Sequence, residues 1–326
     1  MSWWDKLLRA RTDDWVFTPI ADESERAVER RVVEPETAYL GAFLRSMRIV
    51  DVRRGLSRFY GAVSSTATVP HRGGAPAEFF VVTTPTALRD VDAKQADRVL
   101  VLDRRILGPV PYRGGDLELE LGLFSVRSAD LAGPYLDLLE SMASAAGLAF
   151  VGPALALAKP LRDGLELLVG ADGPSMLEIG LAKTFSPPQT GTYCLLAASR
   201  DTVDTDALVL DAAGTLLHRG QPVRDQPYVV VTLDAHDRRD DWSAIPALVK
   251  AHEALAAEVR TGNQARVGDA LAVFRRAAVL DDDLLAADGL RLAEKVAAEV
   301  AMALGTTPTA AVPLAIPSLA EVPLYG

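Results

Sequence analysis

The spacing of the apolar residues changes once along this chain, close to Asp241, and the change limits the folds that the chain can adopt. Before Asp241, short apolar runs follow a period of two, which is the period of a β-strand. In the clearest run, leucines at positions 117, 119, 121 and 123 alternate with Glu118 and Glu120. Such a strand buries one face and exposes the other, as strands of antiparallel sheets do.

Nine runs before Asp241 have the length and the β-branched or aromatic content of strands. We predict strands over residues 39–52, 59–69, 78–84, 98–107, 116–126, 176–185, 192–198, 207–211 and 228–234. These strands do not alternate with helices, as a doubly wound fold requires, so the pattern favours an antiparallel β-sandwich. Helical spacing over residues 130–169, with a break at Gly152–Pro153, predicts a helical hairpin inserted between strands.

After Asp241 the apolar period becomes 3.6, and we predict three helices over Trp242–Arg260, Gln264–Leu280 and Leu284–Leu304. Their short links favour antiparallel neighbours, and Asp241 and Asp283 are suited to cap the first and third helices. No long linker precedes the helices, so we expect them to pack on the sheet.

The predicted fold class is therefore α+β, with an antiparallel β-sandwich-like body, an inserted helical hairpin and a C-terminal three-helix segment. Residues 1–24 form an N-terminal amphipathic helix and connector, and residues 25–240 form the body with its insert at 130–169. Residues 241–305 form the helical segment. Residues 306–326 contain four prolines among apolar residues and are predicted to be extended.

Charge and cysteine content narrow the classes of function. The 326 residues carry a formal net charge of −10, which argues against a general nucleic-acid binder. The single cysteine, Cys194, lies in a predicted buried strand and cannot form a disulfide within the chain. With no apolar leader visible at the N-terminus, these features favour a reducing cytoplasm.

Catalytic motifs are absent from the sequence. It has no phosphate-binding glycine loop, no dinucleotide fingerprint and no Gly-x-Ser-x-Gly. Of four histidines, His71 and His218 lie in predicted turns and His252 on a predicted exposed helix face. His252-Glu253 begins like a zinc-binding motif but lacks the second histidine. We therefore expect no catalytic residue, no bound cofactor and no enzymatic activity.

One acidic segment is a candidate metal site. It contains Asp234, Asp237, Asp240 and Asp241, and clustered carboxylates are the ligands that Ca²⁺ prefers. The preceding Gln-Pro-Tyr-Val-Val-Val resembles the strand motif of C2 β-sandwich domains, which implies loop aspartates that hold calcium. C2 domains take these aspartates from several loops, and no second loop pairs with this one. The alternative is that Asp240 and Asp241 cap a helix and pair with the adjacent arginines.

A second candidate is a basic edge for a phosphate-bearing partner. Its members are the arginines that cluster around one predicted turn, namely Arg45, Arg48, Arg53, Arg54 and Arg58. Charged strand ends beside a turn would give the same pattern without any partner.

Two segments could contact a membrane or a partner. Residues 141–158, which include Phe150, carry no charge over eighteen positions, but they are rich in alanine and therefore only weakly apolar. The N-terminal helix places Trp3, Trp4, Leu7 and Leu8 near one face with cations beside them, as interfacial helices do. Packing against the protein's own body is the alternative for both segments.

The sequence therefore favours a non-catalytic intracellular interaction or adaptor protein that binds a protein partner through its surface. The alternatives are a membrane-acting protein that uses residues 141–158 and the tryptophan helix, and a calcium-binding or metal-dependent protein that uses the acidic segment.

Overall fold

The computed structural model describes residues 15–50, 53–54, 57–71, 76–82, 99–127, 175–199, 201–305 and 314–325. The chain divides into two compact units. We call the larger one the β unit; it holds the sheets and comprises the residues up to Val33, Leu40–Gly108 and Gly114–Ala235. The helical unit comprises Glu34–Tyr39, Pro109–Arg113 and His236–Gly326.

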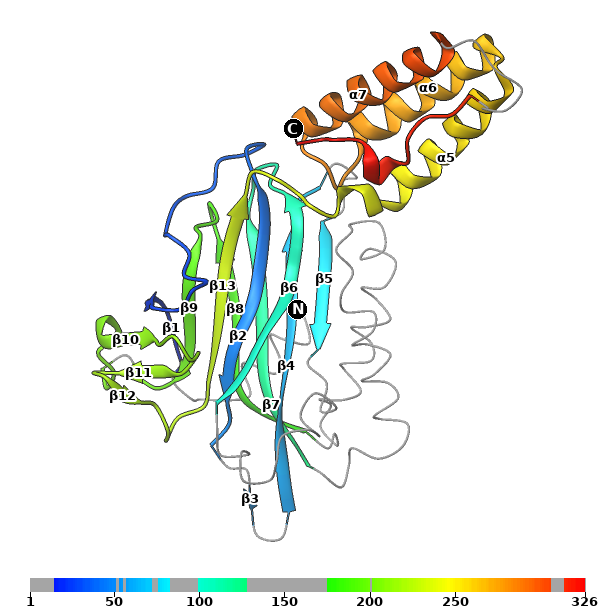
Figure 1. The fold of residues 1–326 in the computed structure, drawn as a ribbon. Coiled ribbons are helices and arrows are strands. Elements are labelled where there is room, and N and C mark those ends of the chain that lie inside the picture. The colour runs from blue at the N-terminus through cyan, green and yellow to red at the C-terminus, as the bar shows by residue number, and fades with distance from the viewer. Residues whose placement is uncertain are drawn as a thin grey trace. The chain divides into compact units, whose positions relative to one another are not determined.

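Two sheets make up the β unit (Figure 1). The eight-stranded sheet has the order β12-β11-β10-β1-β9-β13-β2-β6. Its strands are β1 (Trp15–Asp22), β2 (Tyr39–Arg48), β6 (Leu100–Pro111), β9 (Gly191–Ala197), β10 (Leu208–Leu210), β11 (Leu216–His218), β12 (Gln221–Pro222) and β13 (Tyr228–His236). The five-stranded sheet has the order β3-β4-β7-β8, with β5 also paired to β4. Its strands are β3 (Arg53–Arg54), β4 (Ser57–Val69), β5 (Ala77–Val82), β7 (Leu117–Arg127) and β8 (Ser175–Phe185).

The β unit has the predicted antiparallel, sandwich-like character. Strand β9 pairs antiparallel with β1 and β13, and β7 pairs antiparallel with β4 and β8. The short pairing of β1 with β10 is parallel. The four leucines from 117 to 123 are buried while Glu118 is exposed, so the alternation in β7 predicted its inward face correctly.

Side chains from both sheets meet in an aliphatic and aromatic core. Leu119 of the five-stranded sheet and Leu107 and Val231 of the eight-stranded sheet line one apolar void of about 10 Å³, which is too small for more than one water. Phe17, Phe185 and Tyr193 form a second contact, with ring centroids 5.3 to 6.1 Å apart. The α+β fold class and the sandwich-like body are thus confirmed.

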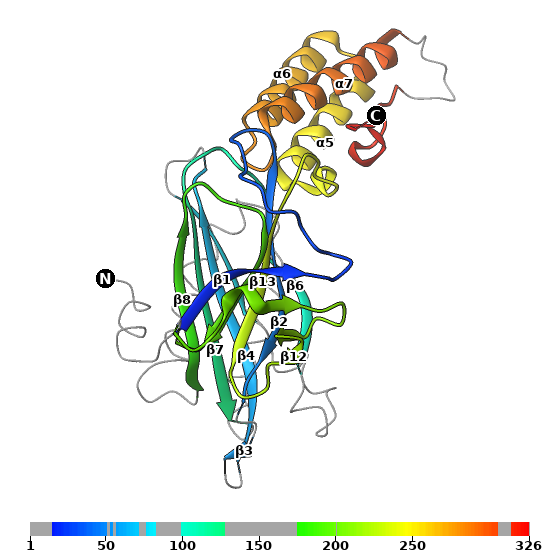
Figure 2. The ribbon, with the colours of Figure 1, turned by 90° about the vertical axis from the view of Figure 1, so that its left-hand side faces the viewer.

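Strand β1 was not predicted. The sequence suggested the end of a helix and a polar connector, because residues 15–22 lack a clear alternation and only Val16 among them is buried. Strand β1, labelled in Figure 2, forms because β9 and β10 supply backbone partners on its two sides. These partners are distant in the sequence, so no local pattern could indicate them. The short strands β11 and β12 of the neighbouring hairpin were also missed.

The helical unit contains α5 (Pro246–Thr261), α6 (Gln264–Leu280) and α7 (Ala286–Gly305), close to the predicted bounds. Pro246 occupies the first turn of α5, where a missing N–H costs nothing. Gly262 ends α5 in the left-handed region with φ 67°, and the Asn263 side chain caps α6 by accepting from the Arg266 N–H. Sequence spacing and caps therefore account for these helices.

The predicted caps at Asp241 and Asp283 are wrong. Asp241 precedes the 3₁₀ turn η3 (Trp242–Ala244), and its side chain makes no cap hydrogen bond. Asp283 lies outside α7, which begins at Ala286. Both carboxylates instead pair with Arg239, so an ion pair competes successfully with helix capping.

Residues 314–325, which we call the tail segment, are extended except for the 3₁₀ turn η4 (Leu319–Glu321). The Glu321 side chain closes this turn, because the Ser318 N–H and hydroxyl both donate to its carboxylate at 2.8 Å. Leu319, Val322 and Leu324 are buried, so the tail segment is part of the fold of the helical unit.

Candidate functional site

The predicted acidic metal site has its members in different environments. Asp234 belongs to β13 and is only 7% exposed, above Gly41 of β2, where any Cβ would collide with its Oδ1. Asp237 and Asp240 are exposed, and Asp241 accepts from Arg239 Nε at 2.7 Å. Within the described ranges, no three His, Cys, Asp or Glu side chains gather as a metal site would require. Asp241 thus takes the alternative role of pairing with an arginine.

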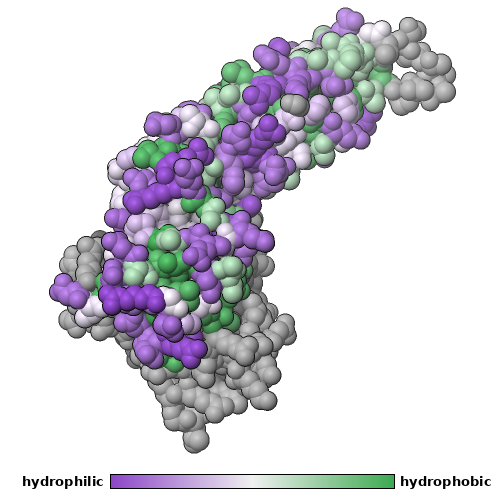
Figure 3. Space-filling model, turned by 60° about the vertical axis from the view of Figure 1, so that its left-hand side comes forward, coloured by the Kyte–Doolittle hydropathy of each residue, from purple (hydrophilic) through white to green (hydrophobic). Residues whose placement is uncertain are grey.

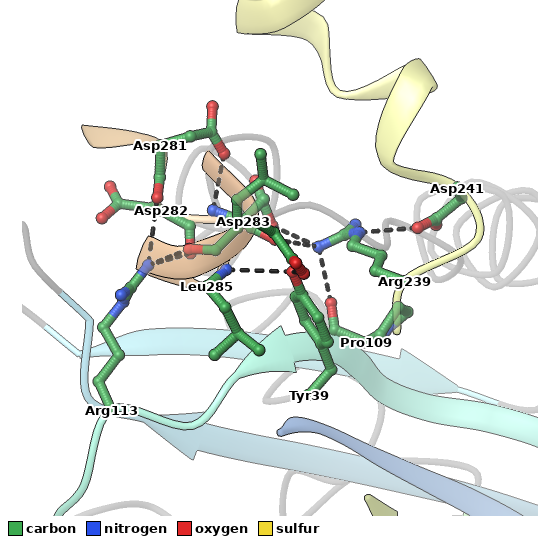
Figure 4. A network of polar contacts seen from close by, with 11 residues as sticks. Tyr39, Pro109, Arg113, Arg239, Asp241, Asp281, Asp282, Asp283 and Leu285 are labelled. Atoms are coloured by element: carbon green, nitrogen blue, oxygen red, sulfur yellow. Dashed lines mark hydrogen bonds and ion pairs between the residues drawn. The ribbon is translucent and has the colours of Figure 1, made fainter. Parts of the chain in front are cut away.

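Arg239 is the centre of a polar network in the helical unit (Figure 4). Its side chain is 0% exposed. Besides the bond to Asp241, its Nη1 donates to the Pro109 carbonyl at 2.8 Å and to the Asp283 carbonyl and carboxylate at 3.0 and 3.2 Å. A buried guanidinium is stable only when its donors are engaged in this way.

A second part of the network surrounds Asp288, in the first turn of α7. The hydroxyls of Tyr39 and Tyr325 donate to its Oδ2 at 2.6 and 2.8 Å, and Arg291 donates to its Oδ1 at 2.9 Å. The Leu285 N–H donates in turn to the Tyr39 hydroxyl. Burial raises the pKa of Tyr325 to about 12, and it raises the pKa of Tyr39 further, so both remain donors at neutral pH.

Arg113 fixes the loop between α6 and α7. It donates to the carbonyls of Asp281 and Leu284 at 3.1 and 2.7 Å and forms an ion pair with Glu36 at 3.0 Å. The Asp281 carboxylate accepts from the Asp283 N–H at 2.8 Å. Burial, opposed by that hydrogen bond, raises the pKa of Asp281 to about 6.

This convergence of ionisable groups has the composition of a reaction centre but the packing of a structural core. Arg239 and the carboxylates around it hydrogen-bond one another and the backbone, and Asp281, Asp283 and Asp288 are all buried. A substrate would have to replace contacts that the side chains already make. The network therefore holds the segments 34–39 and 109–113 to the helices of the same unit.

The predicted exposure of His252 is wrong. The sequence placed it on an exposed face of the first helix, but it is 6% exposed and its ring packs edge-on against Phe274 at 5.9 Å. Burial lowers the pKa of His252, which keeps the ring neutral at physiological pH.

A pocket of about 280 Å³ lies in the β unit, at the edge of the eight-stranded sheet that β12 forms. Its lining contains the aliphatic residues Leu196, Val203, Leu208 and Val223. The remaining lining residues are mainly polar and come from β11, β12 and the loop before β13: His218, Gln221, Pro222, Arg224, Asp225 and Gln226. An aliphatic floor with a few polar groups around it is the usual construction of a ligand site.

His218 also lines this pocket. Its Nε2 is buried and has no hydrogen-bond partner among the described residues. The opposite side chains, Leu196 and Leu208, are almost completely buried and belong to the core cluster of the β unit. The arrangement can therefore hold an apolar group on its floor and offer hydrogen bonds at its rim. Sequence reasoning missed this site, because it treated His218 as an ordinary turn residue.

The predicted basic edge contains arginines with different roles. Arg45 is buried: its Nε pairs with Asp103 at 3.3 Å, and its Nη2 donates to the Ser24 hydroxyl at 3.0 Å. Arg48 donates to the Arg224 carbonyl at 3.1 Å. Arg53, Arg54 and Arg58 lie in the hairpin that β3 and β4 form, and their side chains lie outside the described part of the structure. A partner site at these three arginines stays a prediction.

The predicted membrane-contacting residues lie outside the described ranges. These are Trp3, Trp4, Leu7, Leu8 and Phe150, together with the whole predicted hairpin at 130–169. Among the residues that the structure describes, no helix combines the length and the apolar character needed to cross a membrane.

No protein-family model matches the chain, and no curated protein or solved structure shows significant similarity to it.

Proposed function

We propose that this chain is a non-catalytic intracellular interaction protein that binds a segment of a partner protein in the pocket beside β12. The observation that carries the proposal is the pocket itself, with its aliphatic floor and its polar rim. A volume of about 280 Å³ is close to the lower end of the range for small-ligand sites, so it suits one or two side chains better than a large cofactor.

The chemistry of the lining supports binding rather than catalysis. The rim offers one imidazole, one guanidinium, one carboxylate and amides, and no serine, threonine or cysteine is among the described residues that line the pocket. A bulky aliphatic side chain of the partner would bury apolar area by packing against Val203 and Val223. The polar rim would then hydrogen-bond the peptide groups on either side of that residue. We therefore expect the partner segment to carry such an aliphatic anchor.

A displayed library of random peptides, selected on the full-length chain, tests the proposal. Selected peptides should share a bulky aliphatic residue and bind with micromolar affinity, as expected for a small interface. Binding should weaken at least tenfold in Val223→Glu, because the new charge lies on the apolar floor.

Ala213→Glu is the matched control. It introduces the same side chain and the same change of charge at an exposed position in the turn between β10 and β11, and Ala213 does not line the pocket. Binding that is equally strong in wild type, Val223→Glu and Ala213→Glu would place the peptide elsewhere and overturn the assignment.

A further inference from the structure

The tail segment is bound by the helical unit much as a peptide ligand is bound by a receptor. It follows α5 and α7 (Figures 1 and 2): a Cβ on Gly262, at the end of α5, would lie 3.5 Å from Leu314, and Lys295 of α7 donates to the Pro323 carbonyl. We call Arg239, Gly262, Asp288 and Lys295, with the helix surface between them, the tail-binding surface.

The contacts are of two kinds. Leu319, Val322 and Leu324 are buried and supply the apolar anchors, with Leu324 only 1% exposed. Tyr325 supplies the polar anchor, since its hydroxyl donates to the Asp288 carboxylate at 2.8 Å and accepts from the Arg239 N–H at 3.1 Å. The Arg238 guanidinium lies 5.6 Å from the centre of the same ring, a cation–π contact.

These anchors define a recognisable ligand. They follow the pattern Leu-x-x-Val-x-Leu-Tyr, in which the residues between the anchors, such as Ala320 and Glu321, are exposed. Spaced anchors in an extended segment are also how peptide-recognition surfaces bind short motifs of other proteins. A separate segment that carries the same anchors would therefore make the same contacts.

We propose that the tail-binding surface is an interaction site for a partner protein that carries an extended segment of this same chemistry, and that the tail segment is its resident competitor. Eight residues, 306–313, connect α7 to the tail segment. A short connection of this kind gives an effective concentration on the order of millimolar, so a partner displaces the tail only when it binds more tightly or is itself concentrated. The inference does not depend on the pocket of the β unit.

The test uses a fluorescein-labelled synthetic peptide of residues 314–326 and the full-length chain. Leu324→Asp places a charge in a buried position and should release the tail segment. This variant should bind the peptide at least tenfold more tightly than wild type, as measured by fluorescence anisotropy. Ala320→Asp adds the same charge to an exposed position of the tail segment and should behave as wild type.

The tyrosine anchor is tested in the peptide. A peptide with phenylalanine in place of Tyr325 loses both hydroxyl hydrogen bonds, one of them to a carboxylate, and should bind Leu324→Asp about tenfold more weakly. Equal binding of the two peptides would show that the peptide does not occupy the tail-binding surface.

Two outcomes would overturn the proposal as a whole. The first is a Leu324→Asp chain with intact helices that binds the peptide no better than Ala320→Asp. If Leu324→Asp loses its helices, Tyr325→Phe in the full chain is the milder substitute. A Tyr325→Phe chain that binds the peptide no more tightly than wild type would then also overturn the proposal. The second is a wild-type chain that dimerises in light scattering while Leu324→Asp stays monomeric, because the occupant is then a second copy.

Discussion

Arg239 shows how one side chain can organise a unit of this protein. It donates to the Pro109 carbonyl, to the Asp241 carboxylate, and to both the backbone carbonyl and the carboxylate of Asp283. Its side chain has no exposure to solvent. Removing one partner of such a buried pair leaves an uncompensated charge and typically costs about 3 to 5 kcal/mol. Arg239 is one of the adjacent arginines that the sequence offered as partners of Asp240 and Asp241, and it has this role toward Asp241.

Asp281 makes a residue-scale prediction about pH. Its folded-state pKa is raised from 3.8 to about 6, chiefly by burial, so the folded state binds this proton more tightly than the unfolded state does. The protonated Asp281 carboxyl makes its full contribution to the free energy of unfolding below pH 4, and this contribution is lost as the pH rises through about 6. Asp281→Asn removes the charge and retains an oxygen that can accept the Asp283 N–H.

We expect Asp281→Asn to raise the free energy of unfolding by about 1 to 3 kcal/mol at pH 7, and by much less at pH 4. Urea unfolding followed by helical circular dichroism across this range checks the prediction. Asp269→Asn, at an exposed position of α6, serves as the control and should change stability little at either pH. Destabilisation by Asp281→Asn at pH 7 would mean that attraction to Arg239 outweighs the cost of burial.

At the scale of elements, the helices were the most predictable part of the chain. The prediction for α6 matches Gln264–Leu280, because apolar spacing and the Thr-Gly-Asn link before it are local signals. Strand β1 was missed because its pairing partners lie more than 170 residues away in the sequence. The same limit applies to the polar network: Tyr39, Arg239 and Asp288 are ordinary residues in the sequence, and only the tertiary fold brings them together.

The contact between α6 and α7 depends on Gly289. A Cβ at this position would collide with the Ala278 carbonyl oxygen of α6, and a backbone group cannot move aside as a flexible side chain can. Gly289→Ala should therefore lower the free energy of unfolding of the helical unit by about 1 to 3 kcal/mol or more. The sequence did not indicate this close approach of the two helices, because a glycine within a helix by itself indicates only a position of low helix propensity.

Gly268→Ala supplies the matched comparison. Gly268 lies within α6, and a Cβ there would meet no atom within 4 Å, so the substitution should only improve helix propensity. It is expected to stabilise the helical unit by up to about 1 kcal/mol. Thermal unfolding of both variants measures the difference, and a Gly289→Ala chain as stable as Gly268→Ala would contradict the close helix contact.

On the scale of the whole molecule, the two compact units carry the two proposed binding sites separately. The pocket belongs to the β unit, and the tail-binding surface belongs to the helical unit. On the face that Figure 3 shows, hydrophobic residues of the helical unit are interspersed with hydrophilic ones and form no broad continuous patch. Recognition through a local pocket or a few spaced anchors suits such a surface better than a large flat interface does.

The division into units predicts that damage to one unit stays local. Phe185→Ala removes a buried ring that packs against Phe17 and Tyr193 in the β unit and should cost about 3 to 5 kcal/mol there. Hydrogen exchange measured by mass spectrometry should then rise in β1, β8 and β9 while α5, α6 and α7 keep their protection. Gly289→Ala should produce the reverse pattern. If each variant accelerates exchange equally in both units, the chain unfolds as one cooperative body, and binding at either site would then depend on the stability of the other unit.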